Sequence, residues 1–222
     1  MTDASRPTRT AASTSTSARP ALTVDRFVPA DRDALYDVCL RTGDSGQDAT
    51  DLYQDGDLLG HVYLGAYLAL EPDLARVLRR TDGTAVGYCV ATASTTEFER
   101  SCEETWWPPL RSRLAVPAPD DESPDAHLLR AIHSPARSEA AWLAQYPAHL
   151  HIDLLPEAQG GGAGRRVLEA VLEAVTDAGA PGIHLGVGGR NLRAIGFYEH
   201  LGFRTLQEQP WGRTMGMLLP AR

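Results

Sequence analysis

A cluster of glycines between a predicted strand and a predicted helix constrains this chain more than any other feature. The run is Leu154-Leu155-Pro156-Glu157-Ala158-Gln159-Gly160-Gly161-Gly162-Ala163-Gly164-Arg165. His149 to Leu155 is predicted to form a buried strand, and Gly162 to Ala178 has the apolar spacing of an amphipathic helix. Glycines at such a turn let backbone N–H groups converge on an anion, and the helix start adds about half a positive charge. The segment therefore predicts a phosphate or pyrophosphate site.

Three phosphate-binding motifs compete for this segment, and spacing separates them. The dinucleotide motif G-x-G-x-x-G can begin at Gly160 or Gly162, but it then requires a glycine where Arg165 or Val167 stands. The P-loop motif requires a lysine, and the chain contains none, which also excludes a pyridoxal-phosphate Schiff base. What remains is a glutamine followed by x-x-Gly-x-Gly, here Gln159, Gly162 and Gly164. A glycine-rich turn is by itself also compatible with an ordinary loop.

A second motif lies one predicted helix and one predicted strand downstream, from Asn191 to Phe203. Its spacing is N-x-x-A-x-x-F-Y-x-x-x-G-F, which this chain matches at every named position. Helical periodicity places Asn191, Ala194 and Tyr198 on one face. Gly202 is expected to end the helix in the left-handed conformation. Together the two motifs resemble those of the GNAT family of N-acetyltransferases.

That resemblance implies an α/β fold with a central mixed, mostly antiparallel sheet flanked by helices, and acetyl-CoA as co-substrate. It also implies that the glycine-rich loop holds the pyrophosphate, that the strand before it holds the pantetheine arm, and that one face of the downstream helix meets the cofactor. The predicted cofactor-binding residues are Leu154, Leu155, Gln159, Gly160, Gly161, Gly162, Ala163, Gly164, Arg165, Asn191, Ala194 and Tyr198.

The implied chemistry is direct attack of a primary amine on the thioester carbonyl. An alkylammonium group has a pKa near about 10.4, so the amine must lose a proton before it can attack. The departing thiolate gains from a proton donor, and the family's donor corresponds to Tyr198 here. Asp153, on the strand just before the loop, is our candidate base, although a solvated or capping aspartate would look the same.

A closer resemblance is to the acetyltransferase-like C-terminal domain of animal O-GlcNAc hydrolases, and it indicates a bacterial homologue. It rests on Gly43-Asp44-Ser45-Gly46, Tyr63-Leu64-Gly65-Ala66-Tyr67-Leu68, Gly87-Tyr88 and Cys102-x-x-x-Trp106. The animal domain is regarded as a pseudo-acetyltransferase without the glycine-rich loop, whereas this chain has the loop. The resemblance therefore predicts acetyl-CoA binding. The alternative to an enzyme is a catalytically weak module that binds acetyl-CoA or a protein partner.

The remaining pattern predicts one mixed α/β domain over residues 22–222, after a disordered leader over residues 1–21. Expected elements are strands at 22–29, 182–187 and 203–219, the last broken near Pro210, and helices at 30–41, 61–70 and 191–201. A hairpin is predicted at 74–80 and 84–93, joined by Asp82-Gly83. Residues 94–148 look like an insertion with a helix that Pro108-Pro109 stops and a second helix near 125–132.

Composition limits the other classes of function. The net charge of −8 argues against nucleic-acid binding through phosphates and suits a cationic amine acceptor. No apolar run predicts a membrane span. Three cysteines without a C-x-x-C pair favour reduced thiols and a cytoplasmic location. No metal site is expected, because the aspartates of residues 44–57 lack the calcium-loop spacing, while His149 and His151 suit packing or a substrate contact.

Overall fold

Residues 21–221 are described by the computed structural model, so the predicted leader lies outside the described residues, apart from Ala21. Within this range seven strands form one sheet in the order β1-β2-β3-β4-β5-β7-β6. Neighbouring strands are antiparallel except for β4 and β5, which are parallel. The strands are β1 Leu22–Arg26, β2 Arg76–Arg80, β3 Ala85–Thr92, β4 Ala148–Leu154, β5 Gly182–Gly188, β6 Arg204–Gln209 and β7 Gly212–Leu218. The predicted mixed, mostly antiparallel sheet is confirmed.

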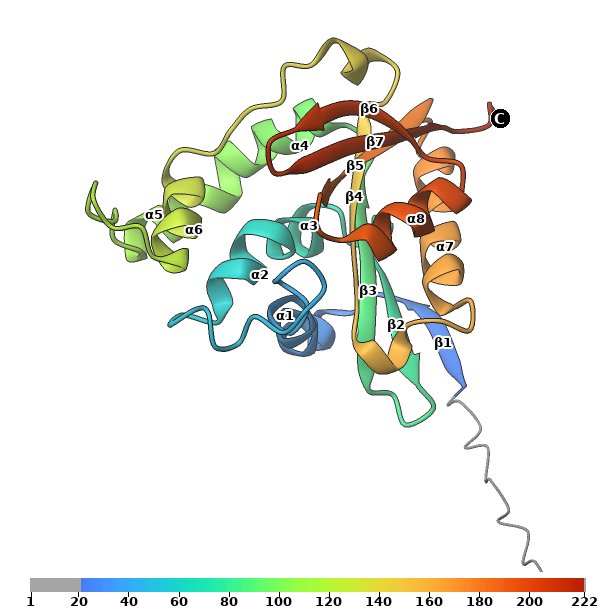
Figure 1. Ribbon diagram of the computed structural model, residues 1–222, viewed down its shortest axis with the longest axis horizontal. Coiled ribbons are helices and arrows are strands. Elements are labelled where there is room, and N and C mark those ends of the chain that lie inside the picture. Colours follow the sequence, from blue (N-terminus) through green and yellow to red (C-terminus); the bar gives the residue numbers. More distant parts are fainter. Residues whose placement is uncertain (1–20, 222) are drawn as a thin grey trace, which may run out of the picture.

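Helices cover the sheet on both sides (Figure 1). One side carries α1 Arg32–Leu40, α2 Asp57–Tyr63, α3 Gly65–Leu70, α4 Thr95–Ser101, α5 Trp107–Arg113 and α6 Pro124–His133. The other carries α7 Ala163–Asp177 and α8 Leu192–His200. Two clusters of buried side chains result, one under α1 to α6 and one under α7 and α8. No helix in this part of the chain has the length and apolar character to cross a bilayer.

The predicted hairpin is present as β2 and β3. Gly83 has a φ of +87°, which a glycine adopts without the Cβ penalty of other residues. The Asp82 carboxylate accepts a hydrogen bond from the Thr84 N–H at 2.9 Å and closes the turn. Local turn chemistry therefore fixes the register of β2 on β3, which in turn borders β4.

The prediction that Pro108-Pro109 stops the helix after Ser94 is wrong. A π turn over Cys102–Trp106 follows α4, and the Trp107 N–H bonds to the Cys102 carbonyl. α5 begins at Trp107, so both prolines lie in its first turn. Amides in a first turn have no helical partner to lose, so proline is tolerated there. The chain therefore continues in helical form across the prolines.

The strands β4 and β5 pair over only two residues each, Ala148 with Ile183 and His149 with His184. Beyond that point β4 continues to Leu154 and β5 to Gly188 with no further pairing between them. The other edge of each strand stays paired, β4 with β3 and β5 with β7. The two strands therefore diverge toward their carboxyl ends, and a gap opens in the sheet. The glycine-rich loop follows β4 at the open end of this gap.

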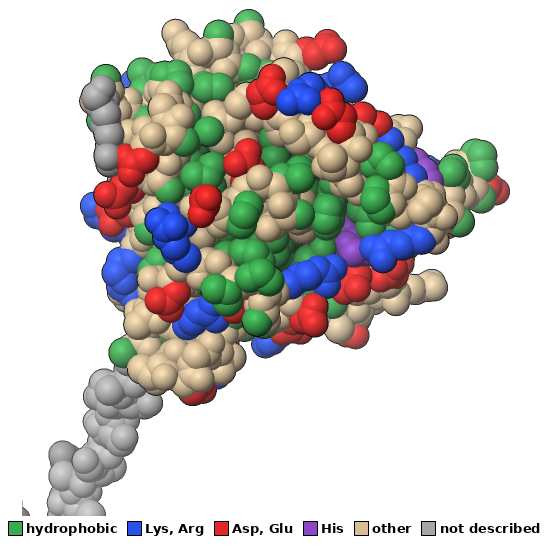
Figure 2. All heavy atoms as spheres, turned by 180° about the vertical axis from the view of Figure 1, so that it is seen from behind, with side chains coloured by type: hydrophobic (Ala, Val, Ile, Leu, Met, Phe, Trp, Pro, Cys, Tyr) green, Lys and Arg blue, Asp and Glu red, His purple; other side chains and the backbone are tan. Residues whose placement is uncertain are grey.

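The face opposite to that of Figure 1 shows how the surface is charged. In Figure 2 apolar side chains gather in the middle of this face, and cationic and anionic side chains alternate around them.

Candidate functional site

The glycine-rich loop has a backbone that other residues adopt only with strain. Gly160, Gly161 and Gly162 have φ values of +80°, +59° and +79°, and Gly162 is the N-cap of α7. This left-handed region costs other residues roughly 1–2 kcal/mol each. In the loop and the first turn of α7, five backbone amides donate to no acceptor among residues 21–221, and these are the amides of Gly160, Gly161, Gly162, Gly164 and Arg165. Five free donors at a helix start form a ready anion site.

Gly164 has a different role from the three glycines before it. It lies inside α7, where a Cβ would stand 3.0 Å from Leu154 Cδ1 and 3.5 Å from Phe197 Cζ. Glycine therefore lets the first turn of α7 approach both β4 and α8. The close approach brings the free amides next to the open end of the gap.

The Gln159 side chain ties the loop to both walls of the gap. Its amide nitrogen donates to the Leu154 carbonyl at 2.9 Å, and its amide oxygen accepts a hydrogen bond from Arg193 on α8. The sequence analysis missed Arg193, which stands at an unspecified position of the second motif. Arg165, by contrast, pairs with Glu169 at 2.7 Å, so its side chain is directed along α7 and only its amide is free for a ligand.

The second motif positions Tyr198 through its backbone. The Asn191 side chain caps α8 by accepting the Ala194 N–H at 3.1 Å. At the other end Gly202 has a φ of +97°, and the Phe203 N–H donates to the Tyr198 carbonyl at 3.0 Å. This Schellman arrangement fixes the last turn of α8. The predicted cap at Gly202 is confirmed.

The Tyr198 ring is buried and packs between Phe197 and Phe203, with ring centroids 5.4 and 5.7 Å away. Its hydroxyl has no hydrogen-bond partner in the part of the chain that the structure describes. Burial, and next the neighbouring Cys89 and Asp153, raise the pKa of Tyr198 well above its usual value. Tyr198 is therefore a protonated phenol with an unused hydroxyl.

Asp153 lies on β4 directly opposite Tyr88 of β3. The Tyr88 hydroxyl donates to Asp153 Oδ2 at 2.5 Å. Burial raises the pKa of Asp153 to about 6, although the hydrogen bonds from Tyr88 and Thr42 lower it. Asp153 is therefore ionised at neutral pH and has one well-held oxygen. It also adds to the raised pKa of Tyr198, so the two predicted catalytic residues interact electrostatically.

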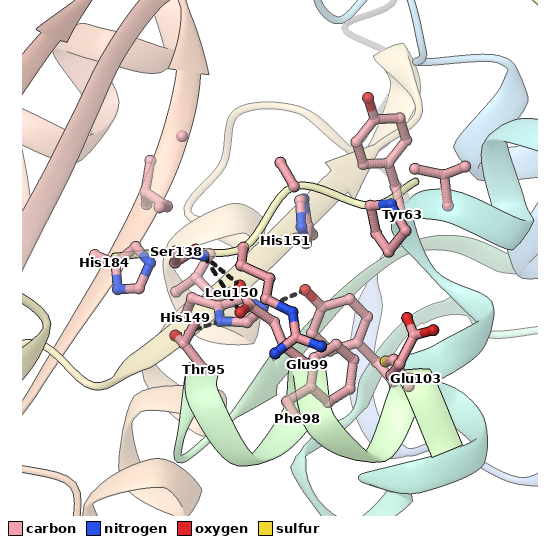
Figure 3. Close-up of a pocket in the computed structure, with 18 of the residues that line it drawn as sticks. Tyr63, Thr95, Phe98, Glu99, Glu103, Ser138, His149, Leu150, His151 and His184 are labelled. Atoms are coloured by element: carbon pink, nitrogen blue, oxygen red, sulfur yellow. Dashed lines mark hydrogen bonds between the residues drawn. The ribbon is translucent and has the colours of Figure 1, made fainter. Parts of the chain in front are cut away.

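A cavity of 380 Å³ lies where β4 and β5 begin to separate (Figure 3). Its walls come from α2 to α5, the segment 135–138, β4 and β5, and they include Tyr63, Tyr67, Phe98, Glu99, Glu103, Arg137, His149, His151 and His184. Neither Asp153 nor Tyr198 lines it. The predicted insertion, residues 94–148, thus forms much of the wall.

The carboxylates of the cavity differ in their partners. Glu103 forms a two-point ion pair with Arg111, at 2.5 and 3.0 Å. Glu99 accepts the Ser138 N–H at 3.2 Å and has no ion pair among residues 21–221. Glu99 is therefore the carboxylate whose charge remains available to a cationic ligand.

The loop after α1 spans the open end of the gap. At one end the Thr42 hydroxyl donates to the Val38 carbonyl of α1 at 2.8 Å, and Asp44 pairs with Arg190, beyond the end of β5, at 3.1 Å. Ser45, directly after Asp44, has a φ of +53°, an uncommon conformation for a residue other than glycine.

Comparisons with known proteins identify the family. The family model described as Acetyltransferase (GNAT) family matches residues 34–203. The chain belongs to the GNAT family of acetyltransferases. Its fold and this membership establish it as an N-acetyltransferase of that family.

Three solved structures agree with the fold. The crystal structure of SsHAT has 37% sequence identity and a TM-score of 0.85, and the match covers 90% of this chain and 98% of that one. The putative acetyltransferase yncA from Salmonella typhimurium, solved with acetyl-CoA, has 16% identity and a TM-score of 0.54 over 91% of this chain and 96% of its own. The PaiA N-acetyltransferase from Thermoplasma acidophilum, solved with coenzyme A, has 13% identity and a TM-score of 0.54, with 89% and 99% covered.

Metal-ligating side chains do not gather in the described range: no three His, Cys, Asp or Glu residues of 21–221 could hold one ion. The aspartate-rich loop uses its carboxylates locally, and Asp48 accepts hydrogen bonds from the Thr50 amide and hydroxyl at 2.9 and 2.6 Å. Cys39, Cys89 and Cys102 are buried free thiols.

Proposed function

We propose that this GNAT protein transfers the acetyl group of acetyl-CoA to a primary amine by direct attack of the amine on the thioester. The observation that carries the proposal is the set of five free amides at the start of α7, next to a gap between two parallel strands. A pyrophosphate is the ligand that such a cradle fits. The likeness to proteins solved with acetyl-CoA or coenzyme A supports the same ligand.

In this proposal the pantetheine arm lies in the gap beside β4. The edge of β4 that faces β5 has no strand partner beyond His149, so its amides and carbonyls can bond to the amide groups of the arm. Leu154 begins that edge at the loop, whereas the Leu155 N–H already donates to the Val86 carbonyl of β3 at 2.9 Å. Asn191 and Ala194 start the helix on the far side. Arg193 adds a cation at the same end.

Tyr198 and Asp153 are the proposed proton-transfer groups. The amine nitrogen forms a bond to the carbonyl carbon, the C–S bond breaks, and its electron pair goes to sulfur. Tyr198 donates its phenolic proton to that sulfur, for which its free hydroxyl and raised pKa are suited. Asp153 is the carboxylate that finally receives the proton of the amine, since it is ionised at neutral pH.

The acceptor is proposed to enter the 380 Å³ cavity, which lies on the α1 to α6 side of the gap. A cavity of this size admits a small amine or one extended side chain, so small molecules, peptides and protein lysines are all candidates. Glu99 favours an acceptor that arrives as a cation. The three free thiols suit a reducing compartment, and we place the protein in the cytoplasm.

Within the family we propose kinship with the acetyltransferase-like domain of O-GlcNAc hydrolases. The segments that carry this resemblance lie around the acceptor side. Tyr63, Tyr67 and Cys102 line the cavity, and Gly43 to Gly46 span the gap. A shared acceptor side would follow from this kinship.

The deciding experiment is calorimetric titration with acetyl-CoA followed by an acceptor screen that measures release of coenzyme A. Saturable release with at least one amine is expected. Binding without release across a broad panel of amines, peptides and proteins would favour a non-catalytic module. A protein that does not bind acetyl-CoA would contradict both readings. The chain has no lysine, so acetylation of its own side chains cannot mimic transfer to a protein acceptor.

A further inference from the structure

Three imidazoles stand on the wall of the acceptor cavity, and their hydrogen bonds differ. His149 and His151 project from β4 on the same face as Asp153, and His184 projects from β5. Figure 3 shows all three near the point where the strands separate. Which of them can serve a substrate depends on which ring nitrogens are already engaged.

His149 has no free nitrogen. The Thr95 hydroxyl donates its proton to the Pro147 carbonyl at 2.7 Å, so its oxygen must accept from His149 Nδ1–H, also at 2.7 Å. In that tautomer Nε2 carries the lone pair, and it accepts the Tyr67 hydroxyl proton at 2.5 Å. His149 is thus fully used in holding α3 and α4 to the sheet.

His184 has one engaged nitrogen. Its Nδ1–H donates to the Tyr146 carbonyl at 2.8 Å, and its ring packs against Trp142 at a centroid distance of 4.6 Å. This histidine is therefore held by the segment before β4.

His151 makes no hydrogen bond within residues 21–221 through either nitrogen, and neither nitrogen is sealed from solvent. Its ring lies between the Tyr63 and Tyr67 rings, at centroid distances of 5.8 and 5.4 Å. A mostly enclosed imidazole with both nitrogens open to a cavity is poised to bond to whatever enters. Burial lowers the pKa of His151 to about 4, so its lone pair is available at neutral pH.

The length of the pantetheine arm brings the thioester to the same place. The arm has about twelve chain atoms, as many as the backbone of four residues, and extends for roughly 13 Å. Four residues back along β4 from Leu154 is Leu150, which lines the cavity beside His151. The arm runs past Asp153 before it ends, so by this measure Asp153 lies beside the arm, several ångströms before the thioester carbonyl. This step rests on the proposed function.

We propose that His151 contacts the acceptor amine directly, accepts its proton as the C–N bond forms, and passes that proton on to Asp153. An acceptor that arrives as an ammonium first loses one proton to water. The lone pair of the neutral amine then forms the bond to the carbonyl carbon as the C–S bond breaks, and the second proton moves to a free ring nitrogen of His151. The two side chains are two residues apart on one strand face, about 7 Å along the strand, so a short chain of waters can carry the proton between them. Since the pKa of Asp153 is raised to about 6 and that of His151 is lowered to about 4, the proton moves downhill from imidazole to carboxylate.

Other titratable groups lie around His151 on the neighbouring elements, and each can contribute to the pH dependence of kcat/KM. They are Tyr63 of α2, Tyr67 of α3, Glu99 of α4, Glu103 of the π turn, Arg137 of the segment 135–138, His149 and Asp153 of β4, and His184 of β5.

The test compares His151→Phe, Asp153→Asn and the double variant, with His200→Phe as the control, since His200 is an exposed histidine of α8 outside the cavity. His151→Phe is expected to lower kcat/KM by about 10²–10⁴-fold, while the calorimetric Kd for acetyl-CoA stays within threefold. If the two groups form one relay, the double variant loses no more than the worse single variant. A His151→Phe enzyme within threefold of wild type, or fully multiplicative losses, would overturn the relay.

A second measurement needs no turnover. Diethyl pyrocarbonate acylates imidazoles that have a free lone pair, and peptide mass spectrometry locates the product. His151 is expected to react, and His149 to resist. Acetyl-CoA with butyltrimethylammonium, neither of which offers an alkyl amine or a free thiol to the reagent, should protect His151 but leave His200 reactive. If His149 reacts faster than His151, or ligands give no protection, the assignment is wrong. Failure of wild type to release coenzyme A would instead count against the proposed function, and this labelling result would still stand.

Discussion

Replacing Tyr198 with phenylalanine isolates one atom of the proposed mechanism. The hydroxyl has no protein partner in the described part of the chain, so its removal leaves no buried group unsatisfied. The ring contacts with Phe197 and Phe203 are retained. We therefore expect the free energy of unfolding to change by less than about 0.5 kcal/mol.

Catalysis should respond very differently from stability. Loss of a positioned acid typically costs about 10²–10⁴-fold in rate, which is roughly 3–5 kcal/mol of transition-state stabilisation. The loss should appear in kcat, because the thiolate then leaves without a proton. The Kd for acetyl-CoA should stay within threefold, since the amides that bind the pyrophosphate are untouched.

Coenzyme A release is measured with a chromogenic thiol reagent. The protein's own thiols do not interfere, because Cys39, Cys89 and Cys102 are buried and burial raises the pKa of each. Tyr88→Phe is the matched control: its hydroxyl does have a partner, Asp153, so this variant should lose about 1.5–3 kcal/mol of stability. A Tyr198→Phe enzyme that folds, binds acetyl-CoA and keeps kcat within twofold of wild type would refute the role of Tyr198.

Three further predictions concern the glycine-rich loop, the Asp153 carboxylate and the hydrogen bond between Arg193 and Gln159. Gly162→Ala and Gly179→Ala both place alanine at a positive φ, +79° and +86° respectively, so each should cost about 1 kcal/mol of stability in urea denaturation. Only Gly162→Ala should weaken acetyl-CoA binding, by tenfold or more in calorimetry. Burial raises the pKa of Asp153 to about 6, so the free energy of unfolding should fall by about 3 kcal/mol as the pH rises from below the unfolded-state pKa through 6. Asp153→Asn should remove this pH dependence and be more stable than wild type at pH 8. Arg193→Ala frees the Gln159 side chain and should raise the KM for acetyl-CoA several-fold in steady-state kinetics while kcat is unchanged. Equal losses of acetyl-CoA affinity in the two glycine variants would contradict the first prediction. Parallel pH profiles of stability for Asp153→Asn and wild type would contradict the second, and an unchanged KM in Arg193→Ala would contradict the third.

The backbone geometry of the proposed cofactor site could be predicted from sequence because its constraints are local. Three glycines with positive φ, a helix start and a strand before it lie within a dozen residues, and the cap at Gly202 is also set by its neighbours. The same local reasoning failed at Pro108-Pro109. There the π turn over Cys102–Trp106, two to six residues before Pro108, had already changed which carbonyl each amide meets, and the sequence pattern does not show that turn.

The proposed acceptor cavity is different because no single segment contains it. Thr95 and Tyr67, from two separate helices, bond to both ring nitrogens of His149. His151, which has no such partner among residues 21–221, stands out only once these contacts are known. Alternation along β4 predicts that the two histidines share a face with Asp153, but not which one lacks a partner. That distinction requires the tertiary contacts of α3 and α4. An acceptor site built from converging elements can therefore change while both sequence motifs stay the same, so the motifs identify the acetyl donor and not the amine.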